Sequence, residues 1–196
     1  MALASWEMAT TARELITAEE YFERVPTRHY SQLIDGEVVM DEPTVGHQVV
    51  VMRILRALQD WTHAKPGRGE VFIPINVLMD EHNVFGPDIS YLREERVPTA
   101  DVHHIAGPPD LAVEVRSPST WRYNLGKKMR SYERLGLPEL WLVDSPVATV
   151  LVYRRSHPKS PDFDVALELT RGEALSSPLL PGFTLALEAI FAPLRP

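Results

Sequence analysis

The sequence predicts an α/β (mixed α+β) protein in which helices flank a mixed β-sheet. Extended runs rich in Val, Ile, Leu and Tyr dominate the middle and end of the 196-residue chain, and two helix-length amphipathic segments separate them. A chain in which strand-like segments and helical segments follow one another packs its helices on the faces of a sheet. Its length favours a single domain. We place that domain at residues 17–196, after an N-terminal extension, residues 1–16, that we expect to be flexible.

The first elements follow from local signals. Thr17 and Glu20 have the spacing of a capping box and predict a helix start. The Asp-Gly dipeptide at 35–36 predicts a hairpin turn. Between 44 and 64, apolar residues recur at helical spacing and predict a long amphipathic helix. Two glycines then end that segment.

The rest of the chain reads mainly as strands. A second helix is expected at about 120–135, because Gly136 and Pro138 follow as stop signals. We expect the tail, residues 176–191, to pack along an edge of the sheet. Extended segments are expected at 70–80, 88–92, 110–115, 139–144, 148–155 and 163–170.

The composition excludes several function classes. The chain has no cysteine, which rules out disulfide frameworks, thiolate zinc sites and cysteine nucleophiles and is typical of a reducing cytoplasm. The start does not resemble a signal peptide and no run is apolar enough to cross a bilayer, so we expect a cytoplasmic protein without a membrane partner. A net charge of −7 argues against general electrostatic binding to DNA. The basic segment 122–134 fits a solvated helix face or a phosphate-contacting surface equally well.

Two predicted strands carry acids in apolar surroundings. In the run 110–116, Leu and Val form one face, and the opposite face carries Glu114 and Arg116. In the run 88–92, Asp88 lies on the face opposite to the apolar side chains. If these strands pair, Asp88 and Glu114 approach each other on one side of the sheet. Two converging carboxylates form a suitable site for Mg²⁺ or Mn²⁺, because such ions prefer oxygen ligands.

A lysine on the following helix is placed to join these acids. Lys128, Tyr132 and Leu135 lie at i, i+4 and i+7, so they share the helix face that points at the sheet. From there a lysine can stabilise negative charge that develops on a phosphate. The same spacing also fits a lysine that extends along the helix with its ammonium group in water.

Purely structural roles are open for the other polar residues. Glu114 can form a buried ion pair with Arg116 or with a helix lysine, although such pairs seldom add net stability. Asp110, which also follows a proline, fits the start of a strand. His47, near the start of the long helix, fits a capping or packing role as well as a place beside the acids.

The quoted segments are similar to those of a known family. "GPDISYL", "GPPDLAVEVRSPST" and "NLGKKMRSYERLGLPELWLVD" resemble the Uma-type restriction endonuclease family. This bacterial family, long catalogued as a domain of unknown function, belongs to the PD-(D/E)xK nuclease superfamily. The resemblance extends to "LITAEEYFERV", to "LIDGEVVM" followed by "GHQ", and to "LLPGFTLALEAIF". It therefore covers nearly the whole chain, from about 17 to 191.

The resemblance implies a restriction-endonuclease-like core and a metal-dependent nuclease site. It implies that Asp88 and Glu114 are metal ligands and that Lys128 is the catalytic lysine, moved to the helix from its usual place two residues after the glutamate. Two positions depart from the family pattern. Members often have a glutamate where this chain has Gln32 and an aspartate where it has Asn124.

The sequence therefore predicts a Mg²⁺-dependent (or Mn²⁺-dependent) endonuclease that hydrolyses phosphodiester bonds of DNA. Asp88 and Glu114 would hold the metal, and Lys128 would orient the attacking water. Arg116, Gln32 and His47 would be auxiliary residues. The two neutral amides and the negative net charge favour an alternative, a catalytically inactive nuclease-fold protein that binds nucleic acid or a protein. A third alternative is an enzyme of the same fold that acts on another substrate. A homodimer would suit the cutting of both strands.

Overall fold

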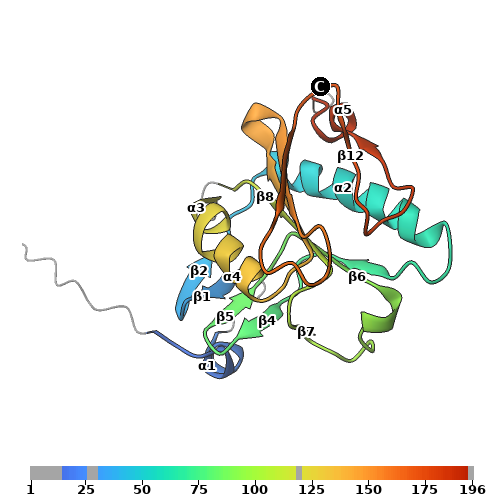
Figure 1. The fold of residues 1–196 in the computed structure, drawn as a ribbon. Helices are drawn as coiled ribbons and strands as arrows, with labels where there is room; N and C mark the ends of the chain where they lie inside the picture. The colour runs from blue at the N-terminus through green and yellow to red at the C-terminus, as the bar shows by residue number, and fades with distance from the viewer. Residues whose placement is uncertain (1–14, 26–30, 118–120, 194–196) are drawn as a thin grey trace, which may run out of the picture.

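The computed structural model describes residues 15–25, 31–117 and 121–193. Within them the chain forms two larger sheets, a short two-stranded sheet and several helices (Figure 1). The elements in chain order are α1 (Ala18–Arg24), β1 (Ser31–Ile34), β2 (Glu37–Met40), α2 (Val45–His63), β3 (Glu70–Phe72), β4 (Val77–Asp80), β5 (Asn83–Phe85), β6 (Ile89–Leu92), η2 (Glu94–Arg96), β7 (Ile105–Ala106), β8 (Leu111–Val115), α3 (Trp121–Tyr123), η3 (Asn124–Lys128), α4 (Met129–Arg134), β9 (Glu139–Asp144), η4 (Ser145–Val147), β10 (Thr149–Arg154), β11 (Val165–Leu169), β12 (Ala174–Leu175), β13 (Leu185–Ala186) and α5 (Leu187–Ile190).

The larger sheet has the strand order β11-β10-β9-β8-β6-β3. It is mixed, because β8 and β9 run parallel whereas its other neighbouring strands are antiparallel. The parallel step follows from the helical crossover α3–α4 between β8 and β9. The second sheet, of order β2-β1-β5-β4-β7, is mixed as well. The predicted fold class, a mixed sheet flanked by helices, is confirmed.

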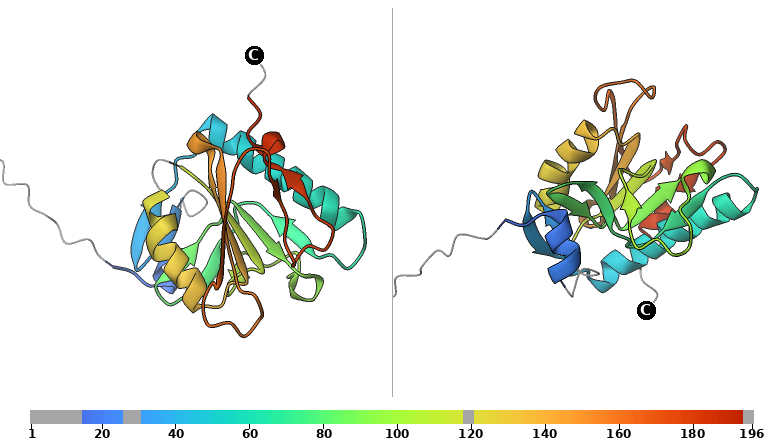
Figure 2. Two further views of the ribbon diagram at one scale, coloured as in Figure 1. Left: turned by 45° about the horizontal axis from the view of Figure 1, so that its top comes forward. Right: turned by 90° about the horizontal axis from the view of Figure 1, so that it is seen from below.

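One face of the six-stranded sheet packs against α2 and the C-terminal segment. The apolar residues of β8 that alternate along one side, Leu111, Val113 and Val115, share a buried cluster with α2. The tail joins the same cluster, and Phe183 stacks on Trp141 of β9 with ring centroids 5.9 Å apart. Figure 2 shows α2 and the tail on one side of the sheet. The prediction that the tail lines a sheet edge is therefore wrong, because its apolar side chains cover the sheet face.

The opposite face packs against α4 and the five-stranded sheet. Ala112 of β8 and Tyr132 of α4 belong to this second cluster together with Phe85 of β5. The rings of Phe85 and Tyr132 meet edge to face, with centroids 5.2 Å apart. The face on which the sequence places Glu114 is therefore enclosed between two layers.

The predicted N-terminal elements are present. Thr17 and Glu20 form both hydrogen bonds of the capping box. Asp35 and Gly36 have positive φ angles of 50° and 77°, as a tight hairpin turn between β1 and β2 requires. Thr44 caps α2. Residues 1–14 of the expected extension lie outside the described part of the chain, and the single domain stays a prediction.

Two predicted elements differ from the structure. The run 70–80 is not one strand: β3 joins the six-stranded sheet and β4 joins the other. Pro74, between them, has no N–H to donate to a ladder. The helix expected at 120–135 is observed from Trp121, but its middle segment, η3, is a π-helix. Residues 118–120 lie outside the described part. None of the described helices is long and apolar enough to span a membrane.

Candidate active site

The register of β6 and β8 brings the two predicted acids together. Ile89 lies opposite Val113 and the strands run antiparallel, so the next step along the register sets Asp88 opposite Glu114. Both side chains are buried, with residue exposures of 7% and 3%. Pairing of the two strands was the condition on which the sequence argument depended.

Asp88 is fixed by the backbone and by α2. Its Oδ2 atom accepts a hydrogen bond of 2.7 Å from the N–H of Val115 and lies 3.2 Å from Nε2 of His47. The backbone N–H of His47 donates a hydrogen bond to the capping hydroxyl of Thr44. Burial lowers the pKa of His47, but the hydrogen bond and the charge of Asp88 outweigh burial, so the pKa is raised overall. His47 thus occupies both places that the sequence left open, at the helix start and beside the acid.

Glu114 binds the lysine that arrives from the helix. Nζ of Lys128 lies 2.5 Å from Oε1 of Glu114, and the hydroxyl of Tyr132 donates to the same oxygen at 2.9 Å. The Lys128 side chain is fully buried, so it does not extend into water. Its ammonium group also lies 5.4 Å from the centre of the Phe85 ring.

The environment makes Glu114 an unusually weak acid. Complete burial raises the pKa of Glu114, the charge of Lys128 opposes this increase and the charge of Asp88 adds to it, so that the pKa is about 7 instead of 4.5. Burial also raises the pKa of Tyr132 well above its ordinary value, and the charge of Glu114 raises it further. Tyr132 therefore stays a hydrogen-bond donor to the carboxylate.

Gln32, from β1, completes the contacts of the lysine. Its side-chain oxygen accepts hydrogen bonds from Nζ of Lys128 at 2.9 Å and from the N–H of Gly86 at 3.1 Å. Two donors converge on one oxygen, so the orientation of the amide is fixed. Gln32 from β1 and Glu114 from β8 therefore contact the same ammonium group.

Arg116 and Asp110 lie outside this group. Nη1 of Arg116 is 3.0 Å from both carboxylate oxygens of Asp144, so the structure does not bring this predicted auxiliary residue to Glu114. Asp110 lies directly before β8, at the strand start expected of it. It also forms ion pairs with Arg93 and Arg96 and accepts a hydrogen bond from the Arg93 N–H.

Asn124 is buried in the π-helical segment, with a residue exposure of 1%. Within the described part of the chain, neither of its amide atoms has a hydrogen-bond partner. It therefore makes no hydrogen bond to the group around Lys128.

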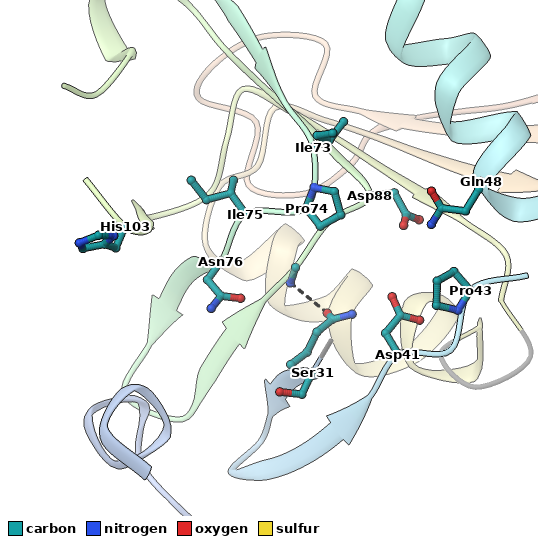
Figure 3. Close-up of a pocket in the computed structure, with 12 residues that line it drawn as sticks. Ser31, Asp41, Pro43, Gln48, Ile73, Pro74, Ile75, Asn76, Asp88 and His103 are labelled. Atoms are coloured by element: carbon teal, nitrogen blue, oxygen red, sulfur yellow. Dashed lines mark hydrogen bonds between the residues drawn. The ribbon is translucent and has the colours of Figure 1, made fainter. Parts of the chain in front are cut away.

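A cavity of about 350 Å³ opens beside Asp88. Asp41, which directly follows β2, lines it together with Asp88 and Gln48, and the three side chains point into one space (Figure 3). Burial raises the pKa of Asp41, and the charge of Asp88 raises it further. Sequence reasoning missed Asp41. The available signal was an acid immediately after the strand that pairs with the strand of Gln32.

Comparison with known proteins identifies the family. The chain matches the Uma2 family, described as "Putative restriction endonuclease", over residues 18–188. The protein belongs to this family. Its structure is similar to that of a putative nuclease of DUF820 from Anabaena variabilis, with a TM-score of 0.74 and 20% sequence identity. The superposition covers 90% of this chain and 97% of the other. No curated protein matches the chain. The resemblance to this family that the sequence predicted is confirmed, and this chain and the DUF820 protein share a fold.

The oxygen donors of this Uma2-family site fit a hard divalent cation. Mg²⁺ is commonly held by one or two carboxylates, with water and substrate phosphate completing its octahedral shell. Asp88 and Glu114 offer two carboxylates on opposed strands, and Asp41 shares the cavity with Asp88. Among the described residues, no group of three or more His, Cys, Asp or Glu side chains is arranged to hold a metal ion by itself. Two carboxylates suit a cation that takes its remaining ligands from water and substrate.

Proposed function

We propose that this Uma2-family protein is a metal-dependent endonuclease that hydrolyses phosphodiester bonds of DNA. One observation carries the proposal: Asp88 and Glu114 lie opposite each other on paired strands, with the ammonium group of Lys128 against Glu114. Asp88 and Glu114 would hold Mg²⁺ or Mn²⁺. When bound, such a cation polarises a phosphoryl oxygen and lowers the pKa of a water nucleophile.

The side chains divide the remaining work between them. The ammonium group of Lys128 has three N–H donors, of which Glu114 and Gln32 engage two. The third donor can orient the attacking water or stabilise negative charge on the phosphate. The N–H of Val115 and His47 both hold Oδ2 of Asp88, which aligns that carboxylate before substrate arrives. Gln32 and His47 therefore position other groups.

A cleavage assay tests the proposal. Supercoiled, linear duplex and single-stranded DNA are incubated with Mg²⁺, with Mn²⁺ or with a chelator, using the wild type and the variants Glu114→Ala and Lys128→Ala. We expect cleavage that needs the cation and that falls about 10²-fold or more in both variants. Arg116→Ala is the matched control, because Arg116 pairs with Asp144 away from the site. Cleavage in the chelator, or cleavage that survives both changes, contradicts the assignment.

Gln32 and Lys128 also supply the observation that favours an inactive protein. The lysine is already neutralised by Glu114 and held by a neutral amide, which would stabilise the fold of a binding module equally well. Binding of DNA without cleavage under every metal condition would establish this second function. Gln32→Glu adds a carboxylate beside Lys128. If the protein is inactive only because Gln32 is neutral, this variant should cleave DNA.

We further propose a homodimer that acts in the cytoplasm. Two copies of the site would allow two DNA strands to be cut in one encounter, and the cysteine-free composition suits a reducing compartment. Light scattering coupled to size-exclusion chromatography measures the oligomeric state directly. A monomeric mass at micromolar concentration contradicts the dimer.

A further inference from the structure

The cavity beside Asp88 has two chemically different ends. Asp41, Asp88 and Gln48 gather at one end, and Ile75, Asn76 and His103 lie toward the other (Figure 3). The first end carries Asp88, one of the two acids that the proposed reaction needs, and a second acid, Asp41. The second end carries no acid among its described residues, so it is suited to a neutral part of the substrate.

The neutral end has the features of a pocket for a flat heterocycle. Ile73, Pro74 and Ile75 form an apolar wall in the irregular segment between β3 and β4. The side chain of Asn76 points into the same space (Figure 3), while its backbone oxygen is engaged by the N–H of Ile105. An amide offers donors and an acceptor together. An apolar wall beside an amide matches the face and the edge of a nucleobase.

The charge and size of the cavity disfavour a paired duplex. No Lys or Arg is among the described residues that line it, and duplex binding depends on such residues against many phosphates. Its volume of about 350 Å³ lies at the lower end of the ~300–1,000 Å³ that small-molecule pockets occupy. A space of this size suits one nucleotide. In a duplex, the edge of each base is already paired and its faces are stacked, so a base reaches such a pocket only when it leaves the helix.

We infer that the cavity binds an unpaired nucleotide, with its phosphate at the Asp88 end and its base at the Asn76 end. The substrate class is then DNA that is single-stranded, or that carries an unpaired nucleotide at the cleavage position. This inference rests on the proposed nuclease function and specifies the substrate of the same site. Base contacts of this kind tolerate different sequences, because every base has an aromatic face.

Three DNA substrates of one sequence test the inference: a single strand, a fully paired duplex, and a duplex with one bulged nucleotide. We expect the single strand and the bulge to be cleaved at least tenfold faster than the paired duplex, with the cut next to the bulge. Equal rates on the paired duplex overturn the inference and leave the proposed nuclease function intact. Absence of cleavage on all three substrates overturns both.

Substitutions at Asn76 test whether the cavity causes the preference. Asn76→Ala removes one hydrogen-bonding group and should raise KM for the single strand about threefold to tenfold, with little change in kcat. Asn76→Trp fills the cavity and should reduce kcat/KM on the single strand by more than tenfold. Gln59→Ala, on α2 away from the cavity, is the control. If Asn76→Ala leaves KM unchanged and Asn76→Trp, shown to be folded by its thermal unfolding, retains full activity, the base pocket is refuted.

Discussion

The buried carboxyl group of Glu114 should make the stability of the protein depend on pH. Its pKa is about 7 in the folded protein against an ordinary 4.5. A difference of about 2.5 pKa units corresponds to about 3 kcal/mol. The unfolded chain ionises this group near pH 4.5, whereas the folded protein retains the proton until about pH 7. The free energy of unfolding should therefore fall as the pH rises through this window and level off above it.

The variant Glu114→Gln isolates this contribution, because glutamine has nearly the same shape and does not titrate. Urea unfolding in a chelator at several values between pH 4.5 and 7.5 gives the free energy of unfolding at each pH. Relative to the variant, the wild type should lose about 3 kcal/mol across the window. Glu168→Gln, the same chemical change at an exposed position of β11, should leave the wild-type dependence in place. Identical pH dependence in wild type and Glu114→Gln refutes the reasoning.

Three further predictions concern the lysine, the tyrosine and the cavity. Lys128→Met should lower the free energy of unfolding, measured with urea at pH 8, by about 3–5 kcal/mol, because it leaves a buried carboxylate unpaired. The double variant with Glu114→Leu should recover most of this loss. Additive losses from the two changes would contradict the pairing. Tyr132→Phe should weaken Mn²⁺ binding, measured by electron paramagnetic resonance, by about tenfold to 100-fold, whereas Tyr91→Phe in the other core cluster should not. The affinity for single-stranded DNA should depend only weakly on salt, because the described cavity lining has no Lys or Arg to neutralise phosphates. Each neutralised phosphate contributes about −0.7 to the slope of log affinity against log salt concentration, so a steep slope that corresponds to many phosphate contacts would contradict this.

The site residues that sequence could predict are those fixed by short-range periodicity. The two-residue period of a strand places Glu114 on one known face of β8. Helical spacing places Lys128 and Tyr132 together, and both are buried in the structure. The π-helical segment does not disturb this pair, because it ends at Lys128 and Tyr132 follows in regular α4.

The positions that sequence could not predict depend on contacts between strands. The alternation rule placed Arg116 with Glu114, but β8 ends at Val115. The parallel register pairs Val115 with Val143, so the next residues along it are Arg116 and Asp144, which form an ion pair. Asp41 approaches Asp88 only because two separate sheets meet at the cavity, and no local pattern encodes that meeting.

The division of the run 70–80 has the same kind of cause. Its apolar residues fit one long strand, and a single proline is a weak signal against it. The two halves belong to different sheets, and the connecting segment lines the cavity. The interruption that sequence reading overlooked therefore provides one wall of the candidate active site.

The ion pair of Glu114 and Lys128 leads to a last prediction. Apolar residues in place of a buried pair are often as stable or more stable, so stability alone does not explain why this pair is present. Binding of a cation requires the ionised carboxylate, while the folded protein retains the proton up to about pH 7. Each cation bound below that pH should release about one proton, so Mn²⁺ affinity should increase about tenfold per pH unit up to pH 7 and then level off. Glu114→Gln should bind Mn²⁺ more weakly and without this slope. A wild-type Mn²⁺ affinity that does not change between pH 5.5 and 7 would show that Glu114 is not a ligand. Lys128 alone would then compensate the charge of the Glu114 carboxylate.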